Sequence, residues 1–155
     1  TDSVIPKEMI DKLVAAKNFL AGYASLRQLQ FGKIDMEWHT NLDIDEINVV
    51  EFEQKTLAHL AVLPQIASVA MSPAFSHIFA GGYAAGYYSY KWAEVLDADA
   101  FSIFKEKGIF NRKVADAFRK KILSRGNIAD ADTLYRDFRG REPQVEALLE
   151  RSGMN

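Results

Sequence analysis

The chain has 155 residues, of which 48% are hydrophobic and 26% are charged. These proportions are ordinary for a globular domain, so they exclude an intrinsically disordered chain and a collagen-like repeat. The net charge of −2 gives no support to nucleic-acid binding. Because cysteine is absent, disulfide bonds, cysteine-based zinc sites and iron–sulfur clusters are also excluded within this chain.

From the sequence we expect no membrane-spanning segment and no signal peptide. No apolar run approaches the roughly 18 residues that a membrane-spanning helix needs. The first residues, Thr1-Asp2-Ser3, are polar, whereas a signal peptide begins with basic and then apolar residues. We therefore expect no membrane partner and a cytoplasmic location. The chain begins without Met, from which we expect that it is cut from a longer polypeptide.

The first part of the chain has the pattern of helices. Apolar residues at helical spacing predict a helix over residues 10–20, and a second apolar face runs from Leu26 to Trp38. Another helix is expected over residues 49–63, because Pro64 follows it. The stretch 71–82 contains Ser, Pro and a Gly pair, which together predict a loop.

Four further helices are expected, each ended by a glycine. They begin at Tyr83, after an Asn111 cap, after an Asp130 or Asp132 cap, and at Pro143, and they end at Gly108, Gly126, Gly140 and Gly153. No alternation of polar and apolar residues is long enough to predict a strand. The prediction is an all-α fold of about seven helices that forms a single multi-helix domain over residues 1–155.

The histidines do not form a metal-binding motif. The zinc-peptidase motif His-Glu-x-x-His needs two His one helical turn apart, whereas His39, His59 and His77 are far apart. His39 and His59 lie within helical patterns and are expected to have hydrogen-bonded structural roles. Residues 43–48 resemble the start of a calcium loop, but Ile47 stands at a ligand position, so we expect an acidic, solvated loop. We predict no metal site within this chain.

A segment rich in tyrosine and glycine covers residues 75–90. If it is helical, Tyr83, Tyr87 and Tyr90 lie at i, i+4 and i+7, which places three phenols on one face. The pair Gly81-Gly82 ahead of them makes a hinge plausible. A buried Tyr must find a partner for its hydroxyl, so this face is either a packing stripe or a ligand-binding surface. The residue types alone leave both interpretations open.

Several motifs of the chain, in order and spacing, closely resemble the C-terminal part of the thimet oligopeptidase family of zinc metallopeptidases. That family includes bacterial peptidyl-dipeptidase and oligopeptidase A. The resemblance covers the whole chain, and the segment 122–127 favours the peptidyl-dipeptidase branch. The motifs that carry it are Asp35-Met36-Glu37-Trp38-His39, Gly81-Gly82-Tyr83, Gly86-Tyr87-Tyr88-Ser89-Tyr90 and Phe138-Arg139-Gly140-Arg141-Glu142-Pro143.

The resemblance implies that this chain is the C-terminal portion of a larger helical peptidase. The whole enzyme would hydrolyse short peptides, with release of C-terminal dipeptides expected. Its zinc is held by a His-Glu-x-x-His helix and a downstream Glu, and this chain contains no such motif. We therefore expect no cofactor and no activity in this chain alone. Its expected partners are peptide substrates and the N-terminal remainder of the enzyme. The isolated chain is expected either to self-associate or to contain a mobile segment.

The resemblance also assigns roles to particular residues. By position, His77 and Tyr90 match catalytic residues that touch the substrate near the scissile bond. Tyr83 and Tyr87, together with the Gly81-Gly82 pair, match a substrate-binding loop. The alternative hypothesis is a non-enzymatic helical domain that uses the tyrosine face to bind a peptide.

Overall fold

The computed structural model describes residues 4–40 and 47–154. Every regular element in these ranges is a helix, which confirms the predicted all-α class. None of the helices in the described ranges is both long and apolar enough to span a membrane. The acidic segment that resembles a calcium loop lies largely outside the described residues. Contacts divide the chain into two compact units, Thr1–Lys91 and Trp92–Asn155, and the assignment of residues 1–155 to one domain stays a prediction.

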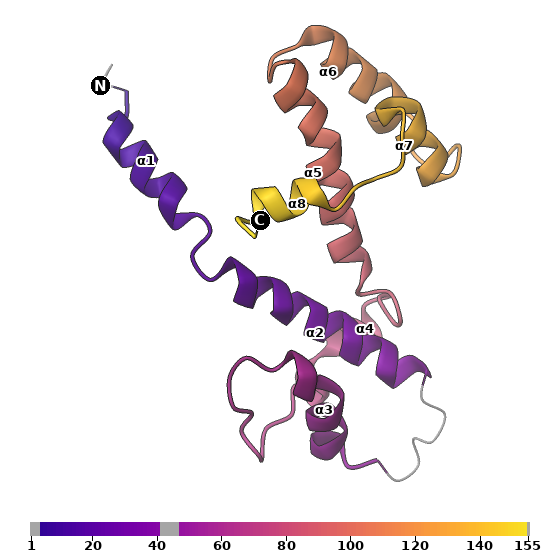
Figure 1. Ribbon diagram of the computed structural model, residues 1–155. Helices are drawn as coiled ribbons and strands as arrows, with labels where there is room; N and C mark the ends of the chain where they lie inside the picture. The colour runs from indigo at the N-terminus through magenta and orange to yellow at the C-terminus, as the bar shows by residue number, and fades with distance from the viewer. Residues whose placement is uncertain (1–3, 41–46, 155) are drawn as a thin grey trace. The chain divides into compact units, whose positions relative to one another are not determined.

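The first unit is built around one long helix, α2 (Figure 1). Its core contains Ile34, Leu57 and Ile78, and the Trp38 and Phe52 rings pack with centroids 4.3 Å apart. The elements are α1 (Lys7–Ala16), α2 (Ala21–Thr40), α3 (Val49–Leu57), the 3₁₀ turns η1 (Ala58–Leu60) and η2 (Ser72–Ala74), and α4 (Ser76–Ala80).

The second unit is formed by α5 (Ser89–Lys107), which begins in the first unit, and by the elements that follow it. Its core includes Val114, Leu134 and Phe138, and the Phe118 and Phe138 rings lie 5.2 Å apart. The later elements are α6 (Arg112–Phe118), the π-helical turn η3 (Arg119–Leu123), α7 (Ala131–Arg139) and α8 (Glu146–Arg151).

Several predicted helix ends are confirmed. The Asn111 side chain accepts hydrogen bonds from the backbone N–H groups of Lys113 and Val114, as a helix cap should. The predicted stop glycines all have the left-handed backbone that favours glycine, with φ of 105°, 54°, 77° and 67°. They are Gly108, Gly126, Gly140 and Gly153.

Several predicted boundaries are wrong. The helix expected over residues 10–20 is α1, which runs from Lys7 to Ala16. The helix expected from Tyr83 begins only at Ser89, because Gly82 and Ala85 have positive φ and residues 84–88 form turns. The three tyrosines therefore do not share a helical face. The expected loop over 71–82 contains η2 and α4, α3 with η1 ends at residue 60, and α8 begins at Glu146, three residues after Pro143.

Candidate functional site

Four aromatic side chains singled out by the sequence meet in the first unit. The centroid of the His77 ring lies 4.7 Å from that of Tyr83, 5.6 Å from that of Tyr87 and 5.8 Å from that of Tyr90, with interplanar angles of 83°, 87° and 65°. Tyr83 and Tyr90 are stacked at 5.2 Å, and Tyr87 lies 5.0 Å from Tyr90. We call these four residues the tyrosine cluster. The turn over residues 84–88, rather than the expected helix, brings these side chains into contact.

Short elements on both sides of a glycine pair hold the cluster together. His77 lies on α4 and Tyr90 in the first turn of α5, and turn hydrogen bonds shape the backbone between them. A Cβ added at Gly81 would lie only 2.8 Å from the His77 carbonyl oxygen, and Gly82 has φ +78°. Both positions therefore need glycine for the backbone to turn back from α4.

The Tyr90 hydroxyl is the exposed polar centre of the cluster. Its oxygen lies 3.2 Å from Nε2 of His77, and the residue is 38% exposed. A hydrogen bond with the Tyr83 phenol is the main cause that raises the pKa of Tyr90 to about 12. The hydroxyl therefore keeps its proton at neutral pH and is able to donate a hydrogen bond to a ligand.

Tyr87 has a different place in the same cluster. It is only 8% exposed, and its hydroxyl donates to the Gln28 side-chain oxygen at 3.1 Å. Burial raises the pKa of Tyr87, and the nearby Arg27 charge partly offsets this effect. Its phenol anchors the turn to α2, so the substrate contact predicted for Tyr87 stays a prediction.

Sequence reasoning missed Asp35 as a part of this site. Its carboxylate has no solvent exposure and accepts hydrogen bonds from the backbone N–H groups of Ala85, at 2.9 Å, and Tyr87, at 2.8 Å. His39 also contacts Asp35, so its predicted structural role is confirmed. The available signal was a single carboxylate between two apolar residues of a predicted helix.

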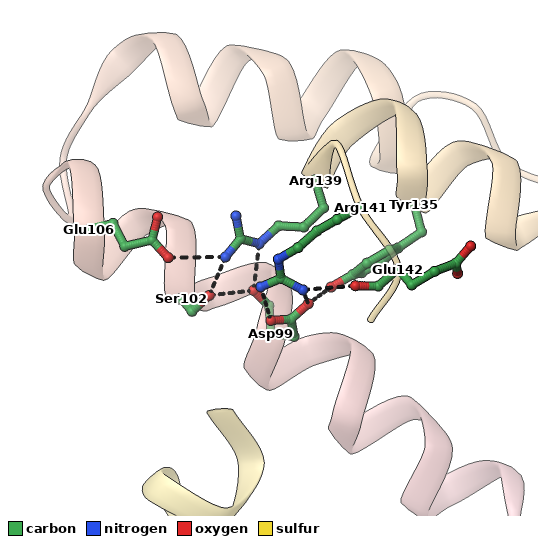
Figure 2. A network of polar contacts seen from close by, with 7 residues as sticks. All are labelled: Asp99, Ser102, Glu106, Tyr135, Arg139, Arg141 and Glu142. Atoms are coloured by element: carbon green, nitrogen blue, oxygen red, sulfur yellow. Dashed lines mark hydrogen bonds and ion pairs between the residues drawn. The ribbon is translucent and has the colours of Figure 1, made fainter. Parts of the chain in front are cut away.

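A second polar cluster, also missed, lies in the second unit (Figure 2). The Asp99 carboxylate is 1% exposed and accepts two hydrogen bonds from the Arg141 guanidinium, at 2.6 and 2.8 Å, and one from the Tyr135 hydroxyl. Arg139 donates to the Asp99 carbonyl at 3.1 Å and to Ser102 at 2.7 Å. We call this set the Asp99 network.

Hydrogen bonds and charges within the Asp99 network fix the protonation state of Asp99. Burial alone would raise the pKa of Asp99, but hydrogen bonds from Arg141 and Tyr135 outweigh burial and lower it. Burial and the Asp99 carboxylate both raise the pKa of Tyr135. The carboxylate is thus charged and its strong acceptor sites are occupied, which is the arrangement of a structural pair rather than of a reactive group.

A cavity with a volume of about 580 Å³ lies in the second unit. Its lining is mostly apolar, with Phe101, Phe104 and Phe118 among the contributors, and it contains none of the predicted site residues. Among the described residues, no group of three His, Asp or Glu side chains lies close enough to hold a metal ion.

Comparison with known proteins finds a match to the family described as Peptidase family M3 over residues 1–154. The chain is 48% identical to oligopeptidase A of Escherichia coli (strain K12), in a match that covers 99% of this chain and 23% of that protein. It is 39% identical to dipeptidyl carboxypeptidase of Salmonella typhimurium, covering 97% and 22%. It is 30% identical to saccharolysin of Saccharomyces cerevisiae, covering 99% and 22%. The chain thus spans less than a quarter of the length of these relatives.

Proposed function

Because the chain belongs to Peptidase family M3, we propose that the whole protein hydrolyses short peptides and that this chain supplies part of the surface around the cleaved bond. The observation that carries this proposal is the exposed, protonated Tyr90 hydroxyl, 3.2 Å from His77 Nε2. Two hydrogen-bonding side chains at the surface of a fixed turn can hold the polar backbone of a bound peptide.

The proposed role of Tyr90 is to donate a hydrogen bond to the carbonyl oxygen of the cleaved peptide bond. Negative charge develops on that oxygen when water adds to the carbonyl carbon. A donor that is already aimed at this position stabilises the transition state more than the ground state. Tyr83, stacked on Tyr90, keeps the ring in place and holds its hydroxyl protonated.

The proposed role of His77 is to orient the substrate. Its ring contacts all three tyrosines of the cluster and is partly exposed. A hydrogen bond from its ring to a backbone carbonyl near the cut would hold the peptide in register with Tyr90. The Gly81-Gly82 pair lets the chain turn between these two residues.

Zinc is the metal that the resemblance to the thimet oligopeptidase family implies. A zinc ion would supply Lewis-acid chemistry at the peptide carbonyl. The described residues offer no ligand set for it, so they do not fit a zinc site of their own. We propose that the metal ligands lie in the remainder of the whole protein.

The product class and the location are part of the proposal. We propose release of C-terminal dipeptides and a cytoplasmic location. Relatives named oligopeptidase A, with the organellar and probable cytosolic forms included, have higher identity, 42–48%, than those named dipeptidyl carboxypeptidase, 38–39%. Arabidopsis relatives are named both cytosolic and organellar. Mass spectrometry of cleavage products and cell fractionation test these two points, and internal cleavage or an organellar fraction would contradict them.

The alternative of a non-enzymatic peptide-binding domain is not favoured by the family match. It makes a different experimental prediction, because a binding domain would retain peptides without cleaving them. Incubation of the whole protein with a quenched fluorescent peptide distinguishes the two functions. Binding without a rise in fluorescence would support the alternative.

The decisive experiment is Tyr90→Phe in the whole protein. We expect kcat to fall by about 10²-fold while KM changes little, because the lost hydroxyl acts mainly in the transition state. Tyr88→Phe is the matched control, since it removes a hydroxyl from a 58% exposed tyrosine of the same turn that lies outside the cluster. A normal kcat in folded Tyr90→Phe protein would remove Tyr90 from the mechanism.

A further inference from the structure

One face of α2 contacts the backbone of residues 85–88, the turn between Tyr83 and Tyr90. Five residues at spacings of three or four lie on this face, and we call them the α2 stripe. They are Gln28, Phe31, Gly32, Asp35 and His39. Gln28 accepts the hydrogen bond of the Tyr87 hydroxyl, and the Phe31 ring lies 5.6 Å from the Tyr87 ring. The stripe therefore holds Tyr87 at both its hydroxyl and its ring.

Gly32 brings the turn close to the helix. A Cβ added at Gly32 would lie 3.6 Å from Cα and 3.7 Å from the backbone nitrogen of Tyr88. The two backbones are thus in close contact at this point. One helical turn further along α2, Asp35 meets the same segment.

The Asp35 carboxylate is surrounded by hydrogen-bond donors. Oδ1 accepts from Ala85 N–H at 2.9 Å, and Oδ2 accepts from Tyr87 N–H at 2.8 Å. Nδ1 of His39 lies 2.9 Å from Oδ1 and 2.7 Å from the Asp35 carbonyl oxygen, so it must carry its hydrogen toward these two acceptors. Only a group that accepts at both oxygens matches these three donors.

Ala85 has a backbone conformation that needs such support. Its φ is +53°, in the left-handed region that a residue with a Cβ rarely adopts. Strained backbone of this kind persists where surrounding contacts fix it, and such residues are frequent at functional sites. The N–H of the strained residue itself is one of the two that Asp35 holds.

We propose that Asp35 is a positioning residue for the proposed peptidase reaction. It fixes the backbone at residues 85 and 87, which lie between Tyr83 and Tyr90, and so sets where the tyrosine cluster stands relative to His77. The proposal rests on the proposed function, since it names what places the Tyr90 hydroxyl. Asp35 acts through the turn and does not touch the substrate.

The test is a double-mutant cycle in the whole protein. Asp35→Asn keeps the size of the side chain but turns an amide N–H₂ group toward a neighbouring donor. We expect kcat to fall about tenfold in the otherwise wild-type enzyme, because a small misplacement of a reacting group is costly. In the Tyr90→Phe background the same change should lower kcat less than about twofold, since the hydroxyl that it positions is gone.

Glu53→Gln is the matched control for a purely structural effect. Glu53 is another buried carboxylate of the first unit, and it accepts hydrogen bonds from the backbone N–H groups of Met71 and Ser72, at 2.8 and 2.5 Å. We expect this variant to lower the melting temperature as Asp35→Asn does. Its effect on kcat per folded molecule should be small and should be the same with and without the Tyr90 hydroxyl.

Amide hydrogen exchange gives a readout that does not depend on activity. Asp35→Asn should speed exchange in residues 83–88, and Glu53→Gln in residues 71–75. If faster exchange is confined to these residues but the wild-type protein is inactive, the proposed function is rejected. The conclusion that Asp35 holds the turn would still stand. An active wild type, an impaired Tyr90→Phe and an Asp35→Asn enzyme with unchanged kcat, or with equal loss in both backgrounds, would overturn the positioning role.

A second variant covers the case in which Asp35→Asn does not fold. His39→Leu removes one donor to Asp35 but leaves the bonds to Ala85 and Tyr87 in place. We expect a smaller loss of kcat, about threefold, that again disappears in the Tyr90→Phe background. A loss of the same size in both backgrounds would contradict the positioning role.

Discussion

The tyrosine cluster and the Asp99 network use similar side chains in opposite ways. In the network, a buried carboxylate with 1% exposure receives hydrogen bonds from Arg141 and Tyr135, and Arg139 holds its backbone (Figure 2). In the cluster, the central Tyr90 is 38% exposed, and its hydroxyl interacts with the His77 imidazole and the Tyr83 phenol. The difference teaches that a polar group with all of its partners inside the fold contributes to stability, whereas an exposed hydroxyl such as that of Tyr90 stays accessible to the ligand that we propose for it.

The largest expected effect comes from breaking the network. Asp99→Asn leaves the Arg141 charge without its partner, and loss of one member of a buried ion pair commonly costs about 3–5 kcal/mol. Urea unfolding of the whole protein measures this loss. Asp97→Asn is the control, because Asp97 is 69% exposed in its pair with Arg151 and should cost less than about 1 kcal/mol. Equal losses for the two variants would remove the contrast between buried and exposed pairs.

A smaller effect is expected from a change in the glycine pair of the cluster. Gly81→Ala would place a Cβ 2.8 Å from the His77 carbonyl oxygen, so the backbone must shift. We expect a loss of about 1–3 kcal/mol in unfolding free energy and a lower kcat, because His77 moves with its backbone. Gly22→Ala is the control, since its added Cβ has nothing within 4 Å and α2 should gain up to about 1 kcal/mol.

Tyr87→Phe tests whether the buried Tyr87 contributes to stability, in contrast to the exposed Tyr90. The buried Tyr87 hydroxyl is bound to Gln28, so its removal should cost about 1 kcal/mol of stability and change kcat little. Thermal unfolding and steady-state kinetics of the same preparation measure both quantities. A large fall in kcat with unchanged stability would instead support the substrate contact that the family resemblance implies for Tyr87.

The smallest expected effect is the pH dependence of the contribution that Asp99 makes to the free energy of unfolding. Its pKa is lowered from 3.8, so Asp99 stabilises the fold fully above this value and loses the contribution as pH falls below it toward the folded-state pKa. Burial alone would raise this pKa, and the hydrogen bonds from Arg141 and Tyr135 outweigh it. The stability difference between wild type and Asp99→Asn should therefore shrink only below about pH 4. A difference that already shrinks near pH 6 would contradict this assignment.

Local sequence signals predicted the helical class and many of the helix ends. Asn111 is a cap because its short side chain reaches the N–H groups two and three residues ahead. Gly140 ends α7 because its φ of 77° is readily accessible to glycine. Both features depend only on residues that are near in the sequence, so they can be predicted from the sequence.

Two other features depend on contacts that are distant in the sequence. The start of α5 was predicted six residues too early, because the periodicity of the tyrosines takes no account of Asp35, which holds Ala85 from 50 residues away. Asp99 meets Arg141 across 42 residues, and neither position shows its partner locally. The resemblance to a family named the candidate site residues, but only the fold shows which contacts hold them in place.

The 50 residues between Asp35 and Ala85 also set the order in which the site can form during synthesis. At about 5–20 residues per second, α2 leaves the ribosome roughly 3–10 seconds before the turn that it carries. Throughout that interval the Asp35 carboxylate faces water instead of backbone N–H groups. The hydrogen bonds between Asp35 and the turn can therefore form only after both segments have been synthesised, and they close a loop of about this length.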